Sequence, residues 1–333
     1  CGEGGLPDGL AGAGGGGRFR AGLRGGGPYM RRGPVELIAG AVRLDLDRDP
    51  RSAVLLAGSG RSGTSWAASL INCRNEYRYV FEPFHPERVP EFANLRRRQY
   101  LRRGEAGEEF LAAARAALSG RLRSRWADRL NRRFVSRRRL VKEIRANLML
   151  GWLRENFPQT PMLLMLRHPF AVAASRARLG WRDNLDDMLG QRRLVEDFLA
   201  PFEARLRRAS SPFERHVLAW CVENLVPLRQ LAPGEVALLF YEELVLHPEQ
   251  GLRPAFAALG RPVPREALAA ARGAGREGLE GWRGRVGEGE LRRGLEALRA
   301  FGLDRVYGEG PLPDRAGALG LMREGVAGGA RKG

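Results

Sequence analysis

The chain has 333 residues, 44% of them hydrophobic and 28% charged, enough to build one large domain or two smaller ones around a sizeable core. No run of about 18 apolar residues occurs, so we expect no membrane-spanning helix, and the N-terminal residues lack the apolar core of a signal peptide. The net charge is +18, but the basic residues are almost all arginine and are scattered rather than interleaved with stacking aromatics, which argues against nucleic acid as the partner.

The two ends of the chain differ in composition from its middle. Residues 1–33 consist mainly of glycine and arginine, and such a segment cannot bury enough apolar surface to offset its ordering entropy. We therefore expect it to be disordered. We place one folded domain over residues 34–312 and expect residues 313–333 to form a disordered C-terminal tail.

Short apolar runs alternate with helical periodicity along the rest of the chain. We predict buried strands at residues 53–57, 78–81, 140–144, 161–166 and 236–241. After the second strand, a stripe typical of a helix packed on a core recurs every four residues, at Phe110, Ala114, Leu118, Leu122, Trp126, Leu130 and Phe134. Strands that are apolar throughout and alternate with helices predict a parallel sheet covered on both faces. The expected fold is a single α/β domain with a central parallel sheet flanked by helices, similar to P-loop NTPases, with a helical insertion after the second strand.

The first predicted strand runs into a glycine-rich turn, residues 58–60, and a helix is expected to begin near Gly63. A strand, a glycine turn and a helix N-terminus in that order expose backbone N–H groups that can bind a phosphate. In the nucleotide phosphate loop GxxxxGK[ST] starting at Gly58, the lysine position is occupied by Thr64. The nearest cation is Arg61, three residues earlier. The loop therefore suits a single 5′-phosphate better than Mg·ATP, and a phosphate-loop kinase is the weaker alternative.

Four short stretches resemble the sulfotransferases that use 3′-phosphoadenosine 5′-phosphosulfate (PAPS). Residues 61–66, Arg-Ser-Gly-Thr-Ser-Trp, are similar to the 5′-phosphosulfate loop of that family, in which lysine commonly takes the place of Arg61. Residues 166–176 are similar to its 3′-phosphate element, in which an arginine at a strand end and a serine eight residues later grip one phosphate. Residues 240–244 resemble its Tyr-Glu-Asp-Leu segment, and residues 276–282 are a looser match to its C-terminal Arg-Lys-Gly loop.

The resemblance implies how the donor nucleotide would be held. Its 5′ end would lie against the glycine-rich loop and its 3′-phosphate against Arg167 and Ser175, with Trp66 stacking on the adenine. No metal is expected. The residues implied in donor binding are Gly60, Arg61, Ser62, Gly63, Thr64, Ser65, Trp66, Arg167, Ser175, Tyr241 and Arg276.

The general base must differ from the histidine of the cytosolic small-molecule enzymes, because that position is Ile144 here. Glu82 resembles the glutamate before proline in carbohydrate and many bacterial sulfotransferases, and a carboxylate there could take an acceptor proton. His85 is the rival base, because its ordinary pKa is nearer neutral pH. Arg61 is expected to stabilise the leaving phosphate. Lys142 is expected to place a second charge on the transferring group, unless its side chain is simply solvated.

We therefore expect a sulfotransferase that moves the sulfuryl group of PAPS to a hydroxyl, or an amine, of a small-molecule, glycan or lipid acceptor. Arginine runs at 96–98 and 137–139 suggest a non-enzymatic alternative, a basic polyanion-binding protein, unless they are solvated helix faces. Three widely spaced cysteines, Cys1, Cys73 and Cys221, cannot all pair. They favour a reducing, cytoplasmic compartment over a disulfide framework or a zinc site.

Overall fold

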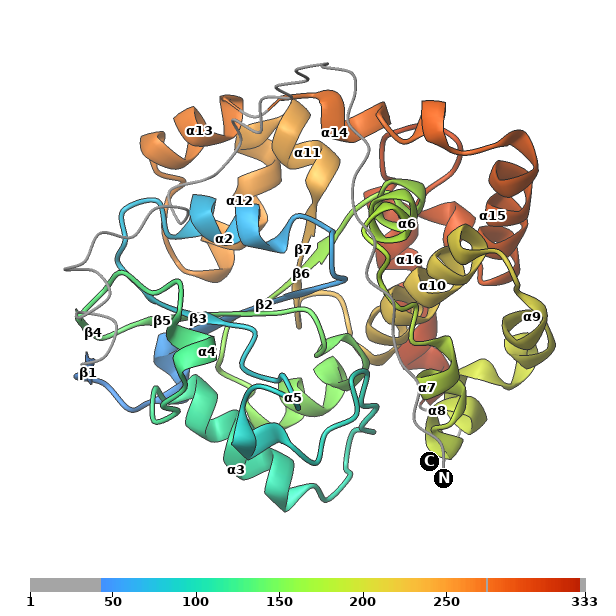
Figure 1. The fold of residues 1–333 in the computed structure, drawn as a ribbon. Coiled ribbons are helices and arrows are strands. Elements are labelled where there is room, and N and C mark those ends of the chain that lie inside the picture. The colour runs from blue at the N-terminus through green and yellow to red at the C-terminus, as the bar shows by residue number, and fades with distance from the viewer. Residues whose placement is uncertain (1–42, 274, 330–333) are drawn as a thin grey trace, which may run out of the picture.

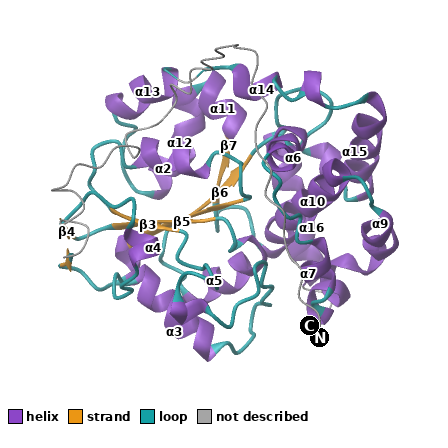
Figure 2. Ribbon diagram, in the orientation of Figure 1, coloured by secondary structure: helices purple, strands orange, loops and turns teal. Residues whose placement is uncertain are grey.

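The computed structural model describes residues 43–273 and 275–329, so the prediction for residues 1–33 lies outside the described part of the chain. At its centre is a five-stranded sheet with helices around it (Figure 1 and Figure 2). A two-stranded sheet, β1 with β4, accompanies it. The described strands are β1 (Leu44–Asp45), β2 (Ala53–Gly58), β3 (Arg78–Phe81), β4 (Val135–Ser136), β5 (Arg139–Glu143), β6 (Met162–Leu166) and β7 (Ala237–Phe240).

The central sheet is parallel, in the order β3-β5-β2-β6-β7. The chain leaves β2 towards one edge to form β3 and β5, then crosses to the other side of β2 to form β6 and β7. The loops that follow β2 and β6 therefore lead in different directions, and open α/β sheets bind their ligands at such a switch point. The register pairs Gly58 with Met165, which brings the carboxyl ends of β2 and β6 together.

The helices lie on both faces of the sheet and beyond β7. They are α2 (Thr64–Ile71), α3 (Glu108–Leu118), α4 (Arg125–Asp128), α5 (Leu150–Asn156), α6 (Pro169–Arg178), α7 (Leu185–Leu189), α8 (Arg192–Leu194), α9 (Glu203–Arg208), α10 (Pro212–Gln230), α11 (Tyr241–Leu246), α12 (Pro248–Ala258), α13 (Arg265–Arg272), α14 (Glu277–Glu280), α15 (Glu288–Ala300) and α16 (Arg315–Gly329). In Figure 1, α2, α11, α12 and α13 lie on one side of the sheet, α3, α4 and α5 on the other. Helices α6, α10, α15 and α16 form a group beside it.

Side chains of each strand alternate between two hydrophobic cores. In β2, Leu55 and Ala57 belong to the core with α3, α5 and α10, whereas Val54 and Leu56 belong to the core with α2 and α12. All four side chains are buried, because helices cover both faces of the sheet. This double burial explains why the strands read as continuous apolar runs. The predicted α/β fold with a central parallel sheet is confirmed.

The helical insertion after the second strand of the sheet is present, but the stripe predicted over residues 110–134 is wrong beyond Leu118, where α3 ends. Gly120 then adopts a left-handed conformation with φ of 73°. A left-handed glycine just after the C-cap is a common way for a helix to end. The buried guanidinium of Arg78 donates to the carbonyl oxygens of Gly120 (2.9 Å) and Leu122 (2.8 Å), which lie beyond the end of the helix.

The disordered tail predicted over residues 313–333 is wrong for the part that the structure describes. There, α16 carries Ala318, Leu321 and Met322, all buried. These three positions follow the i, i+3, i+4 spacing of an apolar helix face. That face packs against α10 and joins the main core. The domain therefore continues past residue 312.

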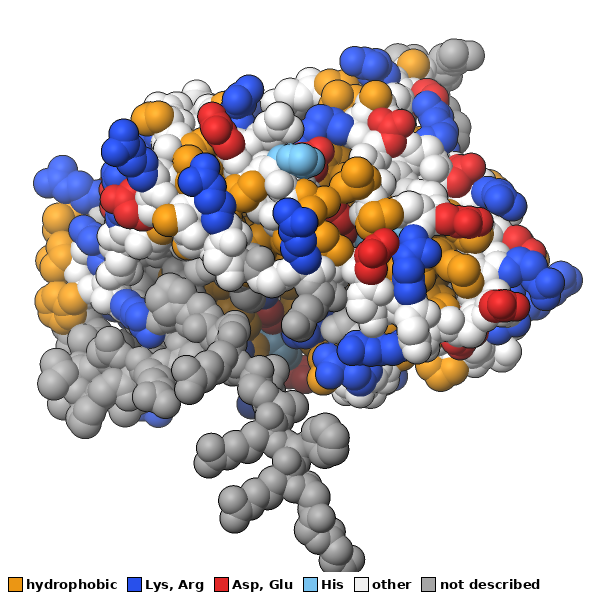
Figure 3. All heavy atoms as spheres, turned by 90° about the horizontal axis from the view of Figure 1, so that it is seen from above, with side chains coloured by type: hydrophobic (Ala, Val, Ile, Leu, Met, Phe, Trp, Pro, Cys, Tyr) orange, Lys and Arg blue, Asp and Glu red, His pale blue; other side chains and the backbone are white. Residues whose placement is uncertain are grey.

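The surface and the arginine runs give little support to a polyanion-binding protein. On the face shown in Figure 3, Lys and Arg side chains are interspersed with Asp, Glu and apolar groups. Two of the arginines in the runs are buried: Arg98 pairs with Glu223 at 2.8 Å, and Arg139 donates to backbone carbonyl groups. In the described ranges, none of the helices combines the length and apolar character that a bilayer crossing requires.

Candidate active site

Two glycines shape the turn that joins β2 to α2. A Cβ at Gly58 would lie 2.7 Å from the carbonyl oxygen of Met165, so β6 can approach closely only because that side chain is missing. Gly63 has φ of 93°, and a Cβ there would lie 2.7 Å from the ring of Tyr241. Helix α2 begins at the next residue, Thr64. Its first N–H groups have no partner within the helix, and its positive dipole end lies at the turn.

Arg167 joins the end of β6 to this turn. Its NH1 donates to the carbonyl oxygen of Arg61 at 3.1 Å, and its NH2 donates to the carbonyl oxygen of Gly278 at 2.7 Å. The guanidinium carbon lies 4.0 Å from the centre of the Tyr241 ring, a cation–π contact. Arg167 and the glycine-rich turn therefore lie at the same edge of the sheet.

The side chain of Arg61 reaches from the turn to the element that follows β6. Its Nε donates to Ser175 Oγ at 3.0 Å, although the two residues are 114 apart in sequence. Burial, followed by the neighbouring charges of Arg167 and Arg178, lowers the pKa of Arg61. Three guanidinium groups that repel one another in this way form a site at which an anion is strongly favoured. The structure thus links the two predicted phosphate elements through Arg61.

The polar atoms at this edge fit phosphate groups. Ser62 Oγ and Arg167 Nε are buried and have no hydrogen-bond partner in the part of the chain that the structure describes. Thr64 is also buried, while Ser65 in the first turn of α2 is exposed. Buried polar atoms are normally satisfied, so the two unpaired ones indicate a missing partner such as a phosphate oxygen for Arg167. Guanidinium groups, hydroxyls and a helix N-terminus are the donors that bind phosphates in proteins.

Two aromatic rings extend this edge. Tyr241 begins α11 directly after β7, and its ring lies beneath the Arg167 guanidinium. Trp66, half-buried in α2, meets Tyr241 edge-on with ring centres 5.4 Å apart. One series of contacts therefore runs from Arg167 through Tyr241 to Trp66. The residues predicted near the nucleotide from three separate elements lie together.

The C-terminal loop reaches the site through its backbone rather than through Arg276. Arg276 is exposed, and its carbonyl oxygen accepts the N–H of Leu279 at 3.0 Å. Gly278 is the residue that contacts Arg167, and a Cβ there would lie 2.6 Å from the Tyr241 hydroxyl. Gly278 was not among the predicted site residues. Its glycine identity within the motif was the available signal.

Glu82 lies where β3 ends, with a buried side chain and a left-handed backbone at φ 43°. Its carboxylate accepts from Lys142 Nζ at 2.6 Å and from Arg145 NH1 at 2.9 Å. The indole N–H of Trp126 donates to the backbone carbonyl oxygen of Glu82 at 3.1 Å. Burial by itself would raise the pKa of Glu82, but the charges of Lys142 and Arg145 outweigh it and hold the pKa below its ordinary value.

Lys142 is not solvated, which removes one of the two interpretations of this residue. Its side chain, on β5, is buried. Nζ donates to the Glu82 carboxylate and lies 4.6 Å from the centre of the Phe81 ring. Burial lowers the pKa of Lys142, and the charge of Glu82 opposes that effect. Arg145, the second partner of Glu82, was missed by the sequence analysis. Its place just after the end of β5 was the only signal.

Glu143 supports both loops that carry these groups. Its carboxylate accepts the backbone N–H groups of Phe84 (2.7 Å), Ile144 (2.8 Å) and Arg145 (2.9 Å). The carboxylate is fully buried, and burial raises its pKa. It ties the loop after β3 to the loop after β5, which fixes Glu82 relative to Lys142. Sequence analysis did not identify this role.

His85 lies on the same loop as Glu82, with its ring edge-on to Trp126 and the two ring centres 4.9 Å apart. Its Nδ1 accepts the backbone N–H of Glu87 at 3.3 Å. Burial, with the nearby charge of Arg145 second, lowers the pKa of His85 to about 4. The argument that favoured His85 as a base, an ordinary pKa near neutrality, therefore does not apply in the folded protein.

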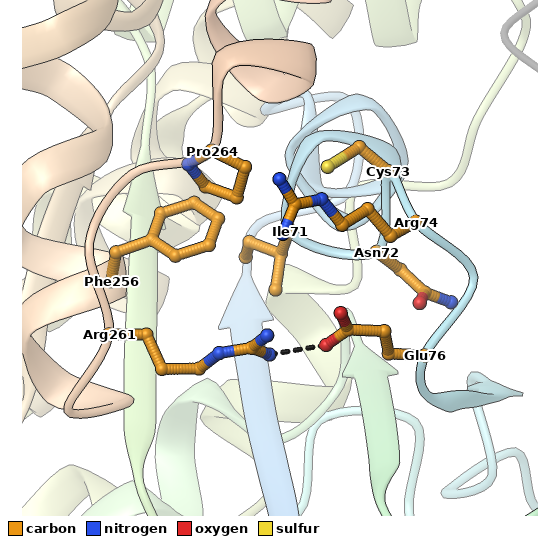
Figure 4. Close-up of a pocket in the computed structure, with 8 residues that line it drawn as sticks. All are labelled: Ile71, Asn72, Cys73, Arg74, Glu76, Phe256, Arg261 and Pro264. Carbon is orange, nitrogen blue, oxygen red and sulfur yellow. Dashed lines mark hydrogen bonds and ion pairs between the residues drawn. The ribbon is translucent and has the colours of Figure 1, made fainter.

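The recess drawn in Figure 4 is separate from this site. It lies at the C-terminal end of α2, opposite the end that faces the glycine-rich turn, and α12 and the residues after it form its other wall. Its lining residues are Ile71, Asn72, Cys73, Arg74, Glu76, Phe256, Arg261 and Pro264. Across the described part of the chain, no group of three or more His, Cys, Asp or Glu could hold a metal ion.

A family model described as the sulfotransferase family matches residues 53–265, more than half of the chain. A comparison with curated proteins finds no match. Among solved structures, the chain is similar to the sulfotransferase domain from the curacin biosynthetic pathway, with 18% identity, 71% of this chain and 82% of that chain covered, and a TM-score of 0.37. It is also similar to the sulfotransferase domain from the Synechococcus PCC 7002 olefin synthase, with 15% identity, 82% and 94% covered, and a TM-score of 0.36. For the sulfotransferase STF9 from Mycobacterium avium the identity is 13%, the coverage 85% and 81%, and the TM-score 0.42.

Proposed function

Because the chain belongs to the sulfotransferase family, we propose that it transfers the sulfuryl group of PAPS to a hydroxyl, or an amine, of an acceptor such as a carbohydrate, a lipid or a secondary metabolite. The observation that carries this proposal is the hydrogen bond from Arg167 to the carbonyl oxygen of Arg61. This contact supports the proposal, because it joins the two elements that would bind the two ends of one nucleotide.

The donor would be held by groups that follow two neighbouring strands, β2 and β6. Backbone N–H groups of the turn and of the first turn of α2 would bind its 5′-phosphate, together with Ser62 and Thr64. Arg167 and Ser175 would bind the 3′-phosphate, which distinguishes PAPS from ATP. The proximity of the Arg61 and Arg167 guanidinium groups supports this site, because the two phosphates of the donor would relieve their mutual repulsion.

The transfer step needs a proton acceptor and charge stabilisation. When bound, the donor supplies an activated sulfuryl group and leaves as adenosine 3′,5′-bisphosphate. Glu82 would accept the proton of the acceptor hydroxyl while the acceptor oxygen forms its bond to sulfur. Lys142 and Arg145 would keep Glu82 ionised and in place, and Arg61 would stabilise the negative charge that develops on the leaving phosphate.

A cytoplasmic, reducing compartment is part of the proposal. In the described part of the chain, Cys73 is half-buried and Cys221 buried, and both are free thiols. Burial raises the pKa of each thiol, which keeps it protonated and unreactive.

Arg167→Met tests the donor site directly. We expect calorimetry with adenosine 3′,5′-bisphosphate to show binding to the wild type and an affinity at least about tenfold lower for the variant, because charge-assisted hydrogen bonds are lost. Arg299→Met, which changes an exposed arginine on α15, is the matched control and should bind as the wild type does. Equal affinities for Arg167→Met and wild type would contradict the assignment.

Turnover then separates the proposed reaction from the kinase alternative. We expect ³⁵S transfer from labelled PAPS to at least one member of a panel of sugars, phenols, lipids and amines. Magnesium-dependent hydrolysis or transfer from ATP should be absent, because Thr64 stands at the lysine position of a nucleotide phosphate loop. ATP turnover without sulfuryl transfer would overturn the proposal.

A further inference from the structure

A buried group of three charges lies behind the glycine-rich turn. Glu223 in α10 accepts from Arg98 Nε at 2.8 Å and from Arg176 NH2 at 2.7 Å. Arg98 comes from the loop before α3, and Arg176 from α6, directly after Ser175. The three side chains are 5% exposed or less, and together they carry one net positive charge. Buried charges are costly, so such a group needs a physical reason to be kept.

Arg176 also donates a hydrogen bond to the turn itself. Its Nε donates to the carbonyl oxygen of Gly60 at 3.1 Å, in a buried hydrogen bond. In a trans peptide the C=O and the following N–H point in opposite directions. Holding the Gly60 carbonyl towards Arg176 therefore turns the N–H of Arg61 to the other side of the peptide, away from the buried charges.

The conformation of the next residue shows that this orientation has to be enforced. Arg61 has φ of 74°, in the left-handed region that residues with a side chain rarely adopt. Its own carbonyl oxygen is held by Arg167. A contact from α10 fixes the turn two residues earlier, because Asn224 Nδ2 donates to Ser59 Oγ at 3.1 Å. Three successive residues of the turn are thus held by hydrogen bonds, from α10, from α6 and from the residue that follows β6.

We propose that Arg176, held by Glu223, is a positioning residue for the donor: it orients the Gly60–Arg61 peptide so that the Arg61 N–H is presented to the 5′-phosphate. This inference rests on the proposed function, because the ligand it serves is the donor nucleotide. Arg176 itself is buried and does not touch the ligand. It acts by removing the need to order the turn when the nucleotide binds, and such preorganisation increases affinity.

The chain offers a matched pair of variants for the test. Arg176→Met removes the contact with Gly60 and leaves Arg98 and Glu223 as a neutral pair. Arg98→Met removes the same charge from the same carboxylate and leaves Arg176 in contact with both Glu223 and Gly60. Neither variant leaves the carboxylate unpaired, so both are expected to fold and to change the melting temperature by similar amounts.

Calorimetry with adenosine 3′,5′-bisphosphate distinguishes a positioning role from a merely structural one. We expect Arg176→Met to lower the affinity about tenfold to a hundredfold, while Arg98→Met stays close to the wild type. Should Arg176→Met fail to fold, Arg176→Lys keeps the charge but has no planar fork to bridge Glu223 and Gly60, and the same loss is expected.

The outcomes separate this inference from the proposed function. If the wild type does not bind the bisphosphate, the proposed function itself is contradicted. If the wild type binds it and a folded Arg176 variant binds it equally well, only the positioning role is overturned. Equal losses in Arg176→Met and Arg98→Met would overturn it too, because they would show that the buried charge matters and the contact with Gly60 does not.

Discussion

At the scale of single residues, the choice between Glu82 and His85 depends on their surroundings and not on their ordinary pKa values. Two cations lower the pKa of Glu82, and burial lowers the pKa of His85 to about 4. Both groups are therefore unprotonated at neutral pH and able to accept a proton. Glu82 differs in being fixed by Lys142 and Arg145 at the carboxyl end of β3. This fixed geometry favours Glu82 as the base.

We expect Glu82→Gln to lower kcat about 100-fold or more, because the amide cannot accept the proton. Affinity for adenosine 3′,5′-bisphosphate should stay unchanged and serves as the check that the variant folds. The measurement is ³⁵S transfer to an acceptor found in the panel, with His85→Gln as the matched variant. Near-normal turnover in Glu82→Gln together with a large loss in His85→Gln would move the base to His85. In the wild type, the loss of the base on acidification should have its midpoint below pH 4.5, the ordinary pKa of a glutamate, because the pKa of Glu82 is lowered.

At the scale of elements, α16 contributes to the site without touching it. It packs on α10, and α10 carries Glu223 and Asn224, which support the glycine-rich turn. Its buried face is formed by Ala318, Leu321 and Met322. A segment that is short, glycine-rich and at the end of the chain resembles a tail in composition. The segment folds because its apolar face packs against α10.

Leu321→Ala should lower the free energy of unfolding by about 2–5 kcal/mol, the usual cost of truncating a buried leucine. Arg323→Ala, on the exposed side of the same helix, should change it by less than about 0.5 kcal/mol. Urea unfolding followed by circular dichroism provides the measurement. A Leu321→Ala variant as stable as the wild type would restore the expectation of a disordered tail.

At the scale of the whole molecule, three histidines make stability sensitive to mild acid. Burial lowers the pKa values of His85, His168 and His216 to about 4 in the folded state. In the unfolded chain they titrate at their ordinary pKa of 6.5, so between pH 6.5 and pH 4 the unfolded state binds more protons. Stability should therefore fall as the pH drops through this window. Burial would raise the pKa of Glu223, but the charges of Arg176 and Arg98 lower it to about 2. Glu223 therefore continues the loss of stability at pH values below this window.

We expect the melting temperature to decrease between pH 6.5 and pH 4, and the decrease to be smaller in His216→Gln. His216 is a suitable choice because its ring is buried and its Nδ1 has no partner within the described residues. His247→Gln, which changes an exposed histidine, is the control and should keep the slope of the wild type. Differential scanning calorimetry at half-unit pH steps measures the slopes. Identical slopes for His216→Gln and the wild type would contradict the assignment.

The sequence by itself determined the sheet, the glycine-rich turn and the pairing of elements around it. Fully apolar runs such as 161–166 predict strands buried on both faces, and parallel strands bring their carboxyl ends to one edge. The turn at 58–63 follows one such strand and Arg167 follows another, so these rules put both at the same edge of the sheet. Local spacing and the rules of parallel sheets contain that information.

Only the tertiary structure decided which distant side chains meet and what burial does to them. Arg61 reaches Ser175, and Glu82 pairs with Lys142 and Arg145, because folding brings separate loops into contact. Periodicity does not encode such contacts, nor could it show that Arg78 is buried against the carbonyl oxygens that follow α3. The same holds for α16 and for the lowered pKa of His85. Each depends on how much solvent and charge surrounds a group, and only the packed structure fixes that quantity.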